Sequence, residues 1–125
     1  MSVKSVGIDL LEVDRMARAI DRWGIPFLNR VFTSGEQEAA NRGIAAEAYA
    51  ARYAAKEAVS KCLGTGFKDG VRRIDIEIVG SESGAPRIQL HGRAVEVASG
   101  ARFMVSLTHT AGMAAAVAVM ITEPD

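Results

Sequence analysis

Two acidic residues stand where the sequence pattern predicts apolar packing. Asp9 lies inside the apolar run VGIDLL, and Glu57 lies in an alanine-rich helical segment that is apolar on most of its sides. A carboxylate in such a setting is costly unless it meets a cation or several hydrogen-bond donors. Mg²⁺ needs only one or two protein carboxylates when substrate phosphate and water supply its other ligands. Asp9 and Glu57 could therefore share a magnesium site if the fold brings them together.

Simpler interpretations of the same residues stay open at this point. Asp9 could cap the helix that we expect to begin near Glu12, because aspartate readily accepts the free N–H groups at a helix start. Glu57 and Lys61 are four residues apart, and an exposed helical pair of this kind contributes only about 0.3–0.5 kcal/mol. The spacing of the residues does not by itself decide between structure and chemistry.

Two further segments carry weaker signals. The segment GTGFKDG, residues 64–70, has glycines that permit positive φ and could leave backbone N–H groups free to bind an anion. It lacks the spacing of a P-loop, however, and an ordinary helix end at Gly64 explains it equally simply. The segment SLTHT, residues 106–110, places His109 at the end of a predicted strand. Neither His91 nor His109 has the spacing of a zinc ligand.

The composition indicates one folded domain over residues 1–125. The chain has 49% hydrophobic and 24% charged residues, and its 15 basic and 15 acidic side chains cancel. This balance argues against a nucleic-acid-coating role. We expect no signal peptide and no membrane span, because no stretch approaches the roughly 18 apolar residues that a span needs. The single cysteine, Cys62, favours a reducing cytoplasm.

The hydrophobic periodicity predicts the elements that must position these residues. A strand over residues 3–11 should lead into a helix whose apolar face comprises Val13, Met16, Ala17, Ile20 and Trp23. The opposite face carries Arg15, Arg18 and Arg22. Pro26 bars a simple continuation of this helix, so we expect the chain to turn after Gly24.

The rest of the chain predicts an α+β fold. Thr33 and Glu36 form a capping-box pattern before a short helix over residues 34–41. A central helix should span residues 45–63 and end at Gly64. We expect strands at residues 71–78, 87–90, 103–108 and 113–121, a turn at 81–86 and a short helix at 93–98. The strands should form a mainly antiparallel sheet packed against the central helix.

Several segments together resemble the short phosphopantetheinyl transferases, the holo-acyl-carrier-protein synthase family. They are VGIDLLEVDR at 6–15, VFTSGE at 31–36, ARYAAKEAVSKCLGTGF at 51–67, SGAP at 83–86 and VSLTHT at 105–110. The resemblance implies a Mg²⁺-dependent enzyme that transfers 4′-phosphopantetheine from coenzyme A to a serine of apo-acyl-carrier protein. Adenosine 3′,5′-bisphosphate would be released, and the reaction would support fatty acid biosynthesis. The family also implies a homotrimer with active sites between subunits.

The resemblance further implies roles for individual residues. Asp9 and Glu57 would hold Mg²⁺ together with the coenzyme A diphosphate, and Lys61 would lie against the same diphosphate. Glu57 and Lys61 are the expected catalytic residues. Arg52 and the His109 segment would lie near the adenosine and its 3′-phosphate. The full expected coenzyme-binding set is Arg52, Lys56, Lys61, Gly64, Thr65, Gly66, Pro86, His109 and Thr110.

The arginine face of the first helix is the predicted docking surface for the carrier protein. Carrier proteins of this kind are acidic, and Arg15, Arg18 and Arg22 offer local positive charge. An ordinary solvated helix surface is the simpler interpretation of three arginines at this spacing. Two other functions also fit the sequence: a non-catalytic module that binds coenzyme A or a nucleotide, and a small oligomeric scaffold held by ion pairs.

Overall fold

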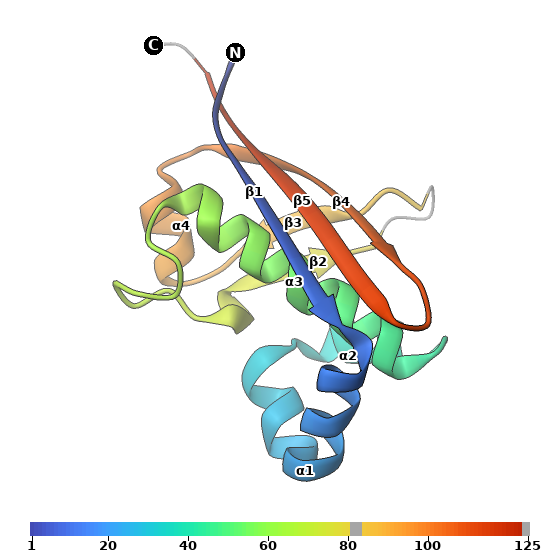
Figure 1. The fold of residues 1–125 in the computed structure, drawn as a ribbon. Coiled ribbons are helices and arrows are strands. Elements are labelled where there is room, and N and C mark those ends of the chain that lie inside the picture. Colours follow the sequence, from blue (N-terminus) through green and yellow to red (C-terminus); the bar gives the residue numbers. More distant parts are fainter. Residues whose placement is uncertain (81–83, 124–125) are drawn as a thin grey trace.

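A long helix, α3 (Ala45–Leu63), runs through the middle of the molecule (Figure 1) and contributes buried residues to both of its hydrophobic clusters. The computed structural model describes residues 1–80 and 84–123. The other elements along the chain are β1 (Ser2–Glu12), α1 (Val13–Val31), α2 (Ser34–Ala40), the 3₁₀ turn η1 (Arg73–Asp75), β2 (Ile76–Val79), β3 (Arg87–Leu90), α4 (Arg93–Ala98), β4 (Arg102–His109) and β5 (Met113–Thr122).

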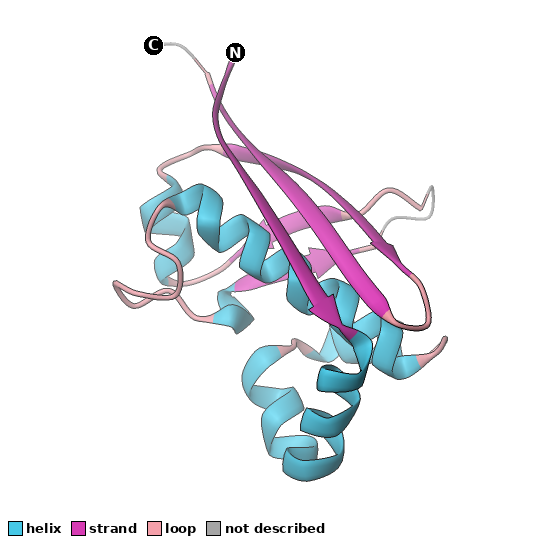
Figure 2. Cartoon of the chain, viewed as in Figure 1, coloured by secondary structure: helices cyan, strands magenta, loops and turns pink. Residues whose placement is uncertain are grey.

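The strands form two antiparallel sheets. One sheet has the order β1-β5-β4, and the second consists of β2 and β3 alone. Figure 2 shows the long strands of the first sheet running across α3, with α1 and α2 gathered at the end of the molecule where β1 enters α1. The predicted α+β class, with antiparallel strands around a central helix, is confirmed, although the strands divide between two sheets.

Small side chains let β1 lie very close to α3. Ala54 and Ala58 on α3 are fully buried, and they pack beneath Ala116 and Ala118 of β5. At Gly7 a Cβ atom would lie only 1.9 Å from the carbonyl oxygen of Ala58. No side chain fits there, because the two backbones themselves are in contact. This contact fixes β1 against α3 two residues before Asp9.

Local sequence signals predicted several elements closely. The helix α3 has the expected bounds, and its C-cap Gly64 has the left-handed conformation, with φ of 82°. The capping box before α2 is present: Glu36 N–H donates to Thr33 Oγ1 and Thr33 N–H donates to Glu36 Oε1. The strand β3 and the helix α4 also have the predicted bounds. Each of these signals acts within a few residues, so distant packing does not override it.

One prediction about α1 is confirmed and one is wrong. The helical course breaks at Gly24, whose φ of 63° and ψ of −149° are not helical, so the chain turns there as expected before a second helical part continues to Val31. Pro26 then lies in the first turn of the second helical part, where its missing N–H costs nothing. Trp23 is 58% exposed and does not belong to the buried face. That face is carried by Val13 and Met16, which are buried.

The strand predicted over residues 71–78 is also shorter than expected. Residues Arg73–Asp75 form a 3₁₀ turn, and the strand β2 begins only at Ile76. The Asp75 carboxylate is buried and accepts the backbone N–H of Arg72, which stabilises the turn. The predicted turn at 81–86 includes residues 81–83, which lie outside the described residues. Among the described helices, none is long and apolar enough to cross a membrane.

The outer face of the three-stranded sheet is apolar and uncovered. Val6, Ile8 and Leu10 of β1 and Met104 of β4 are each more than 60% exposed. The register places Val6 opposite Val119 and Met104 opposite the same Val119, so these side chains lie in one row across the sheet. We call Val6, Ile8, Leu10, Met104 and Val119 the outer apolar face.

Candidate active site

Asp9 lies within β1 and faces the central helix. Its Oδ1 accepts a hydrogen bond from Lys61 Nζ at 3.2 Å, and the same ammonium donates to the Ile8 carbonyl at 2.7 Å. The helix α1 begins after Glu12, whose side chain makes no capping hydrogen bond. Asp9 is therefore not a helix cap. It is a strand residue whose charge is met by Lys61 of α3.

Glu57 lies one helical turn before Lys61 but pairs with a different cation. Its Oε1 accepts hydrogen bonds from Arg73 Nε at 3.0 Å and from Arg73 Nη2 at 2.8 Å. The guanidinium carbon of Arg73 lies 4.2 Å from the centre of the Phe67 ring and 5.2 Å from that of Tyr53. Both distances fall in the range of cation–π contacts. The exposed Glu57–Lys61 pair that helical spacing allowed is not what forms.

The result is a cluster of two acids and two cations. Asp9, Lys61, Glu57 and Arg73, which we call the four-charge cluster, come from β1, α3 and η1. Each carboxylate side chain is 20% exposed. The i, i+4 spacing places Glu57 and Lys61 on one face of α3, and Lys61 binds Asp9. Arg73 was missed by the sequence analysis, because it lies 16 residues from Glu57 and no local pattern signals the contact.

The oxygen donors of this cluster suit a magnesium ion that shares a substrate phosphate. No group of three or more histidine, cysteine, aspartate or glutamate side chains gathers as a metal cage among residues 1–80 and 84–123. A pair of carboxylates is what Mg²⁺ commonly takes from a protein when phosphates and water complete its octahedron. Both N–H groups of Arg73 converge on Oε1 of Glu57, so Oε2 lies outside that fork. The cluster therefore fits Mg²⁺ bound with a phosphate ligand rather than alone.

A second candidate pocket brings together three of the predicted coenzyme-binding residues. Arg52, Pro86 and His109 line a hollow of about 260 Å³. The guanidinium of Arg52 donates from Nη1 to the Ala48 carbonyl at 3.2 Å, but its buried Nε has no hydrogen-bond partner among the described residues. Burial lowers the pKa of Arg52. An unpartnered buried donor of this kind is unusual and is suited to an acceptor brought by a ligand.

His109 contributes a second polar group to this pocket. Its Nδ1 lies 3.0 Å from Oε1 of Glu47, near the start of α3. The imidazole is about half exposed, while the Glu47 carboxylate is largely covered. The carboxylate thus fixes one ring nitrogen and orients the ring at the mouth of the pocket.

Lys56 lies neither in the four-charge cluster nor in the pocket of Arg52, Pro86 and His109. This corrects its predicted role in binding the coenzyme. Its side chain is fully buried, and Nζ donates to Glu36 Oε1 at 2.8 Å and to the carbonyls of Arg73 at 3.1 Å and Ile76 at 2.7 Å. These three bonds use all the protons of the ammonium. Lys56 instead ties α3 to α2 and to the turn before β2.

The glycine loop and Thr110 likewise use their polar groups within the chain. The N–H of Gly64 donates to the Lys61 carbonyl, and the N–H of Gly66 donates to the Ser60 carbonyl. Thr65 Oγ1 donates to the Gly66 carbonyl. Thr110 Oγ1 accepts the N–H groups of Gly112 and Met113 at the β4–β5 turn. The amides of Gly64 and Gly66, two of the loop N–H groups that could have bound an anion, are therefore already paired within the chain.

The arginine face of α1 is exposed as predicted. Arg15, Arg18 and Arg22 line a surface hollow of about 470 Å³, together with Asp21 and Trp23. The Arg22 guanidinium lies 4.9 Å from the centre of the exposed Trp23 ring. Trp23, which the sequence pattern had assigned to the buried face, thus adds an apolar surface beside the positive charges.

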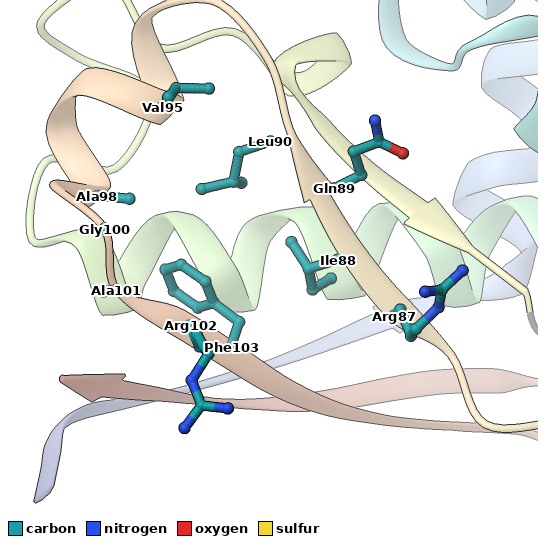
Figure 3. Close-up of a pocket in the computed structure, with 10 residues that line it drawn as sticks. All are labelled: Arg87, Ile88, Gln89, Leu90, Val95, Ala98, Gly100, Ala101, Arg102 and Phe103. Atoms are coloured by element: carbon teal, nitrogen blue, oxygen red, sulfur yellow. The ribbon is translucent and has the colours of Figure 1, made fainter. Parts of the chain in front are cut away.

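Another hollow lies away from these residues, between β3, α4 and β4 (Figure 3). It has a volume of about 490 Å³, and Ile88, Leu90 and Phe103 give it an apolar lining. Two arginines, Arg87 and Arg102, stand at its rim, and Arg102 is paired with Glu123 at 2.6 Å. None of the predicted site residues lines this hollow.

Comparison with known proteins shows which family has this fold and these motifs. The family model of the 4′-phosphopantetheinyl transferase superfamily matches residues 5–112. The chain belongs to this superfamily. The match covers most of β1 and all of α3 and β4, and so includes Asp9, Glu57, Lys61 and His109.

Named relatives make the class more specific. The chain is 42% identical over 118 residues to a holo-acyl-carrier-protein synthase of Solibacter usitatus, covering 89% of this chain and 92% of the relative. It is 42% identical over 130 residues to a synthase of the same name from Methylobacterium radiotolerans, covering 98% and 96%. The predicted enzyme class, a phosphopantetheinyl transferase of the holo-acyl-carrier-protein synthase kind, is confirmed. This finding disfavours the non-catalytic module and the scaffold.

Solved structures agree with the fold. The Helicobacter pylori holo-acyl-carrier-protein synthase, solved in complex with coenzyme A, superposes with a TM-score of 0.84 at 29% identity, covering 94% of this chain and all of that one. The Mycobacterium tuberculosis acyl carrier protein synthase superposes with a TM-score of 0.79 at 37% identity, covering 98% and 100%. The order of elements and the two sheets are thus those of an established enzyme fold.

Proposed function

We propose that the protein transfers 4′-phosphopantetheine from coenzyme A to a serine of an apo-acyl-carrier protein, in a Mg²⁺-dependent reaction that releases adenosine 3′,5′-bisphosphate. The observation that carries the proposal is the pairing of Asp9 with Lys61 across β1 and α3, one helical turn from Glu57. Acids and cations placed together in this way suit a bound metal and a diphosphate. The related synthase solved with coenzyme A supports the same substrate.

Two regions of the chain would hold the two ends of coenzyme A. The unpartnered Nε of Arg52 and the ring of His109 would receive the 3′-phosphate and the adenosine, with Pro86 in the same pocket. Lys61 would contact the diphosphate. Asp9 and Glu57 would hold Mg²⁺, which supplies charge neutralisation at the phosphates when bound. These assignments keep the reacting phosphorus close to α3.

Lys61 and Glu57 are the proposed catalytic residues. Lys61 would stabilise the charge that grows on the departing adenosine bisphosphate, or donate a proton to it. Glu57 would accept the serine proton directly or through a water. Because a carboxylate that also holds a cation is a weakened base, the route through a water demands less of Glu57.

The carrier protein would dock on the arginine face of α1. Arg15, Arg18 and Arg22 offer positive charge to an acidic partner, and the exposed Trp23 offers an apolar contact beside them. The helix α1 follows directly from β1. A protein held on its outer face would therefore have its serine close to Asp9.

We also propose that the enzyme is a cytoplasmic homotrimer serving fatty acid synthesis. The outer apolar face is a contiguous surface that one small domain leaves uncovered, and such surfaces usually mark contacts between proteins. Packing copies of this face together would also place β1, and with it Asp9, near a subunit boundary. The buried, unpaired thiol of Cys62 suits a reducing compartment.

The direct test is a transfer assay read by mass. The protein is incubated with coenzyme A, Mg²⁺ and an apo-acyl-carrier protein, and the carrier is then weighed. We expect the carrier to gain one phosphopantetheine group, and we expect EDTA to abolish the gain. A carrier whose serine is replaced by alanine is the matched control. No gain in mass with several apo-carriers would refute the proposed function.

A further inference from the structure

We propose that Arg73 is a positioning residue that keeps the four-charge cluster neutral, so that Mg²⁺ and coenzyme A bind to it as a pair rather than separately. The proposal rests on the proposed function, because it assumes that Glu57 is a ligand of Mg²⁺. It assigns a role to a side chain that no sequence motif marked.

The geometry shows that Arg73 is fixed in place. Its Nε and Nη2 both bind Oε1 of Glu57, and its guanidinium is in contact range of two aromatic rings, Phe67 and Tyr53. Its main chain is also held, because its carbonyl accepts a proton of the buried Lys56. A planar guanidinium that is held by two hydrogen bonds and two ring contacts keeps one geometry. The Glu57 carboxylate is therefore oriented before any ligand arrives.

The charges of the cluster cancel within the chain. Asp9 is paired with Lys61 at 3.2 Å, and Glu57 is paired with Arg73 at 2.8 Å. Mg²⁺ alone would leave this neutral cluster strongly positive, and a diphosphate alone would leave it negative. The two together leave it close to neutral. Charges that lie a few ångströms apart in a partly covered site interact strongly. An excess of either sign is therefore unfavourable, and each ligand should bind poorly without the other.

Removing the charge of Arg73 should therefore change the two separate affinities in opposite directions. In Arg73→Met the cluster is negative when empty. Mg²⁺ without coenzyme A should bind about tenfold more tightly, and coenzyme A in EDTA should bind several-fold more weakly. A residue that only stabilised the fold would weaken both ligands or neither.

Arg72 provides a matched control one residue away. It carries the same charge, but its side chain is 72% exposed and pairs with Asp75 instead of Glu57. The experiment titrates Mg²⁺, and separately coenzyme A in EDTA, into the full-length wild type, Arg73→Met, Arg72→Met and Arg73→Lys by calorimetry. Arg72→Met should resemble the wild type in both titrations. Arg73→Lys keeps the positive charge and should restore the weak binding of Mg²⁺ alone.

The outcomes separate this inference from the proposed function. If Arg73→Met and Arg72→Met show the same two affinities as the wild type, Arg73 has no such role, even though the wild type binds coenzyme A with Mg²⁺. If the wild type does not bind coenzyme A with Mg²⁺ at all, the proposed function itself fails. Should Arg73→Met not fold, Arg73→Gln replaces it, since the amide keeps a donor for Glu57. Failure of both to fold would assign the contact to stability and overturn the inference.

Discussion

The two acids of the proposed site, Asp9 and Glu57, are each paired with a cation. Asp9 and Glu57 could each have been an ordinary cap or surface pair, but each meets a basic group from another part of the chain, Lys61 or Arg73. Breaking either contact would leave a partly covered carboxylate without its cation. Such arrangements are more typical of a site prepared for charged ligands than of a surface.

Lys61 should act mainly in the chemical step. We expect Lys61→Ala to lower kcat more than it raises KM for coenzyme A, because a cation facing the leaving group acts most strongly on charge that develops in the transition state. Steady-state kinetics with saturating carrier protein measure both constants. Lys68→Ala is the control, because Lys68 is an exposed lysine in the loop after α3. A change in KM alone would make Lys61 a ground-state anchor.

At the scale of elements, the contact between β1 and α3 sets the geometry of the site. We expect Gly7→Ala to destabilise the fold by about 1–3 kcal/mol or more, because its Cβ would overlap the Ala58 carbonyl. Transfer activity should fall as well, since Asp9 follows two residues later on the same strand. Chemical denaturation measures the stability.

The matched variant for Gly7 is Gly43→Ala. Gly43 has no atom within 4 Å of an added Cβ. Its substitution should change stability by no more than about 0.5 kcal/mol. Equal stability of Gly7→Ala and Gly43→Ala would mean that the close approach of β1 to α3 is not required.

The arginine face of α1 is the proposed docking surface for the carrier protein. Reversing two charges in an Arg15→Glu, Arg22→Glu double variant should raise KM for the carrier protein at low salt and leave KM for coenzyme A nearly unchanged. Raising the salt concentration should weaken carrier binding to the wild type, because salt screens the approach. Arg42→Glu is the control on an exposed arginine outside α1. An unchanged carrier KM in the double variant would place the docking surface elsewhere.

The sequence predicted those features that depend on neighbouring residues. The bounds of α3, the Gly64 cap and the capping box at Thr33 follow from signals a few residues long. It did not predict the burial of Lys56, because Arg52, Lys56 and Lys61 look alike in a helical pattern until packing decides which face is covered. It also missed Arg73, whose contact with Glu57 depends on where η1 folds back on α3.

At the scale of the whole molecule, the outer apolar face predicts association. We expect Val6→Glu to convert the proposed trimer to monomers, because it would introduce a charge into the proposed apolar contact between copies. Light scattering on a sizing column measures the mass. Val95→Glu is the control, since Val95 is also an exposed apolar residue but lies on α4. If wild type, Val6→Glu and Val95→Glu share one mass, this face is not the subunit interface.

Above all, we propose that Asp9 and Glu57 hold one magnesium ion for phosphopantetheine transfer. The most direct measurement is the rate at which an apo-carrier protein gains mass in the presence of Mg²⁺ and coenzyme A, compared among the wild type, Asp9→Ala and Glu57→Ala. Thermal unfolding serves to confirm that each variant is folded. We predict that both variants remain folded and lose more than about a hundredfold of the transfer rate, as removal of a principal electrostatic group in an active site does. Full Mg²⁺-dependent turnover in either folded variant would contradict the assignment.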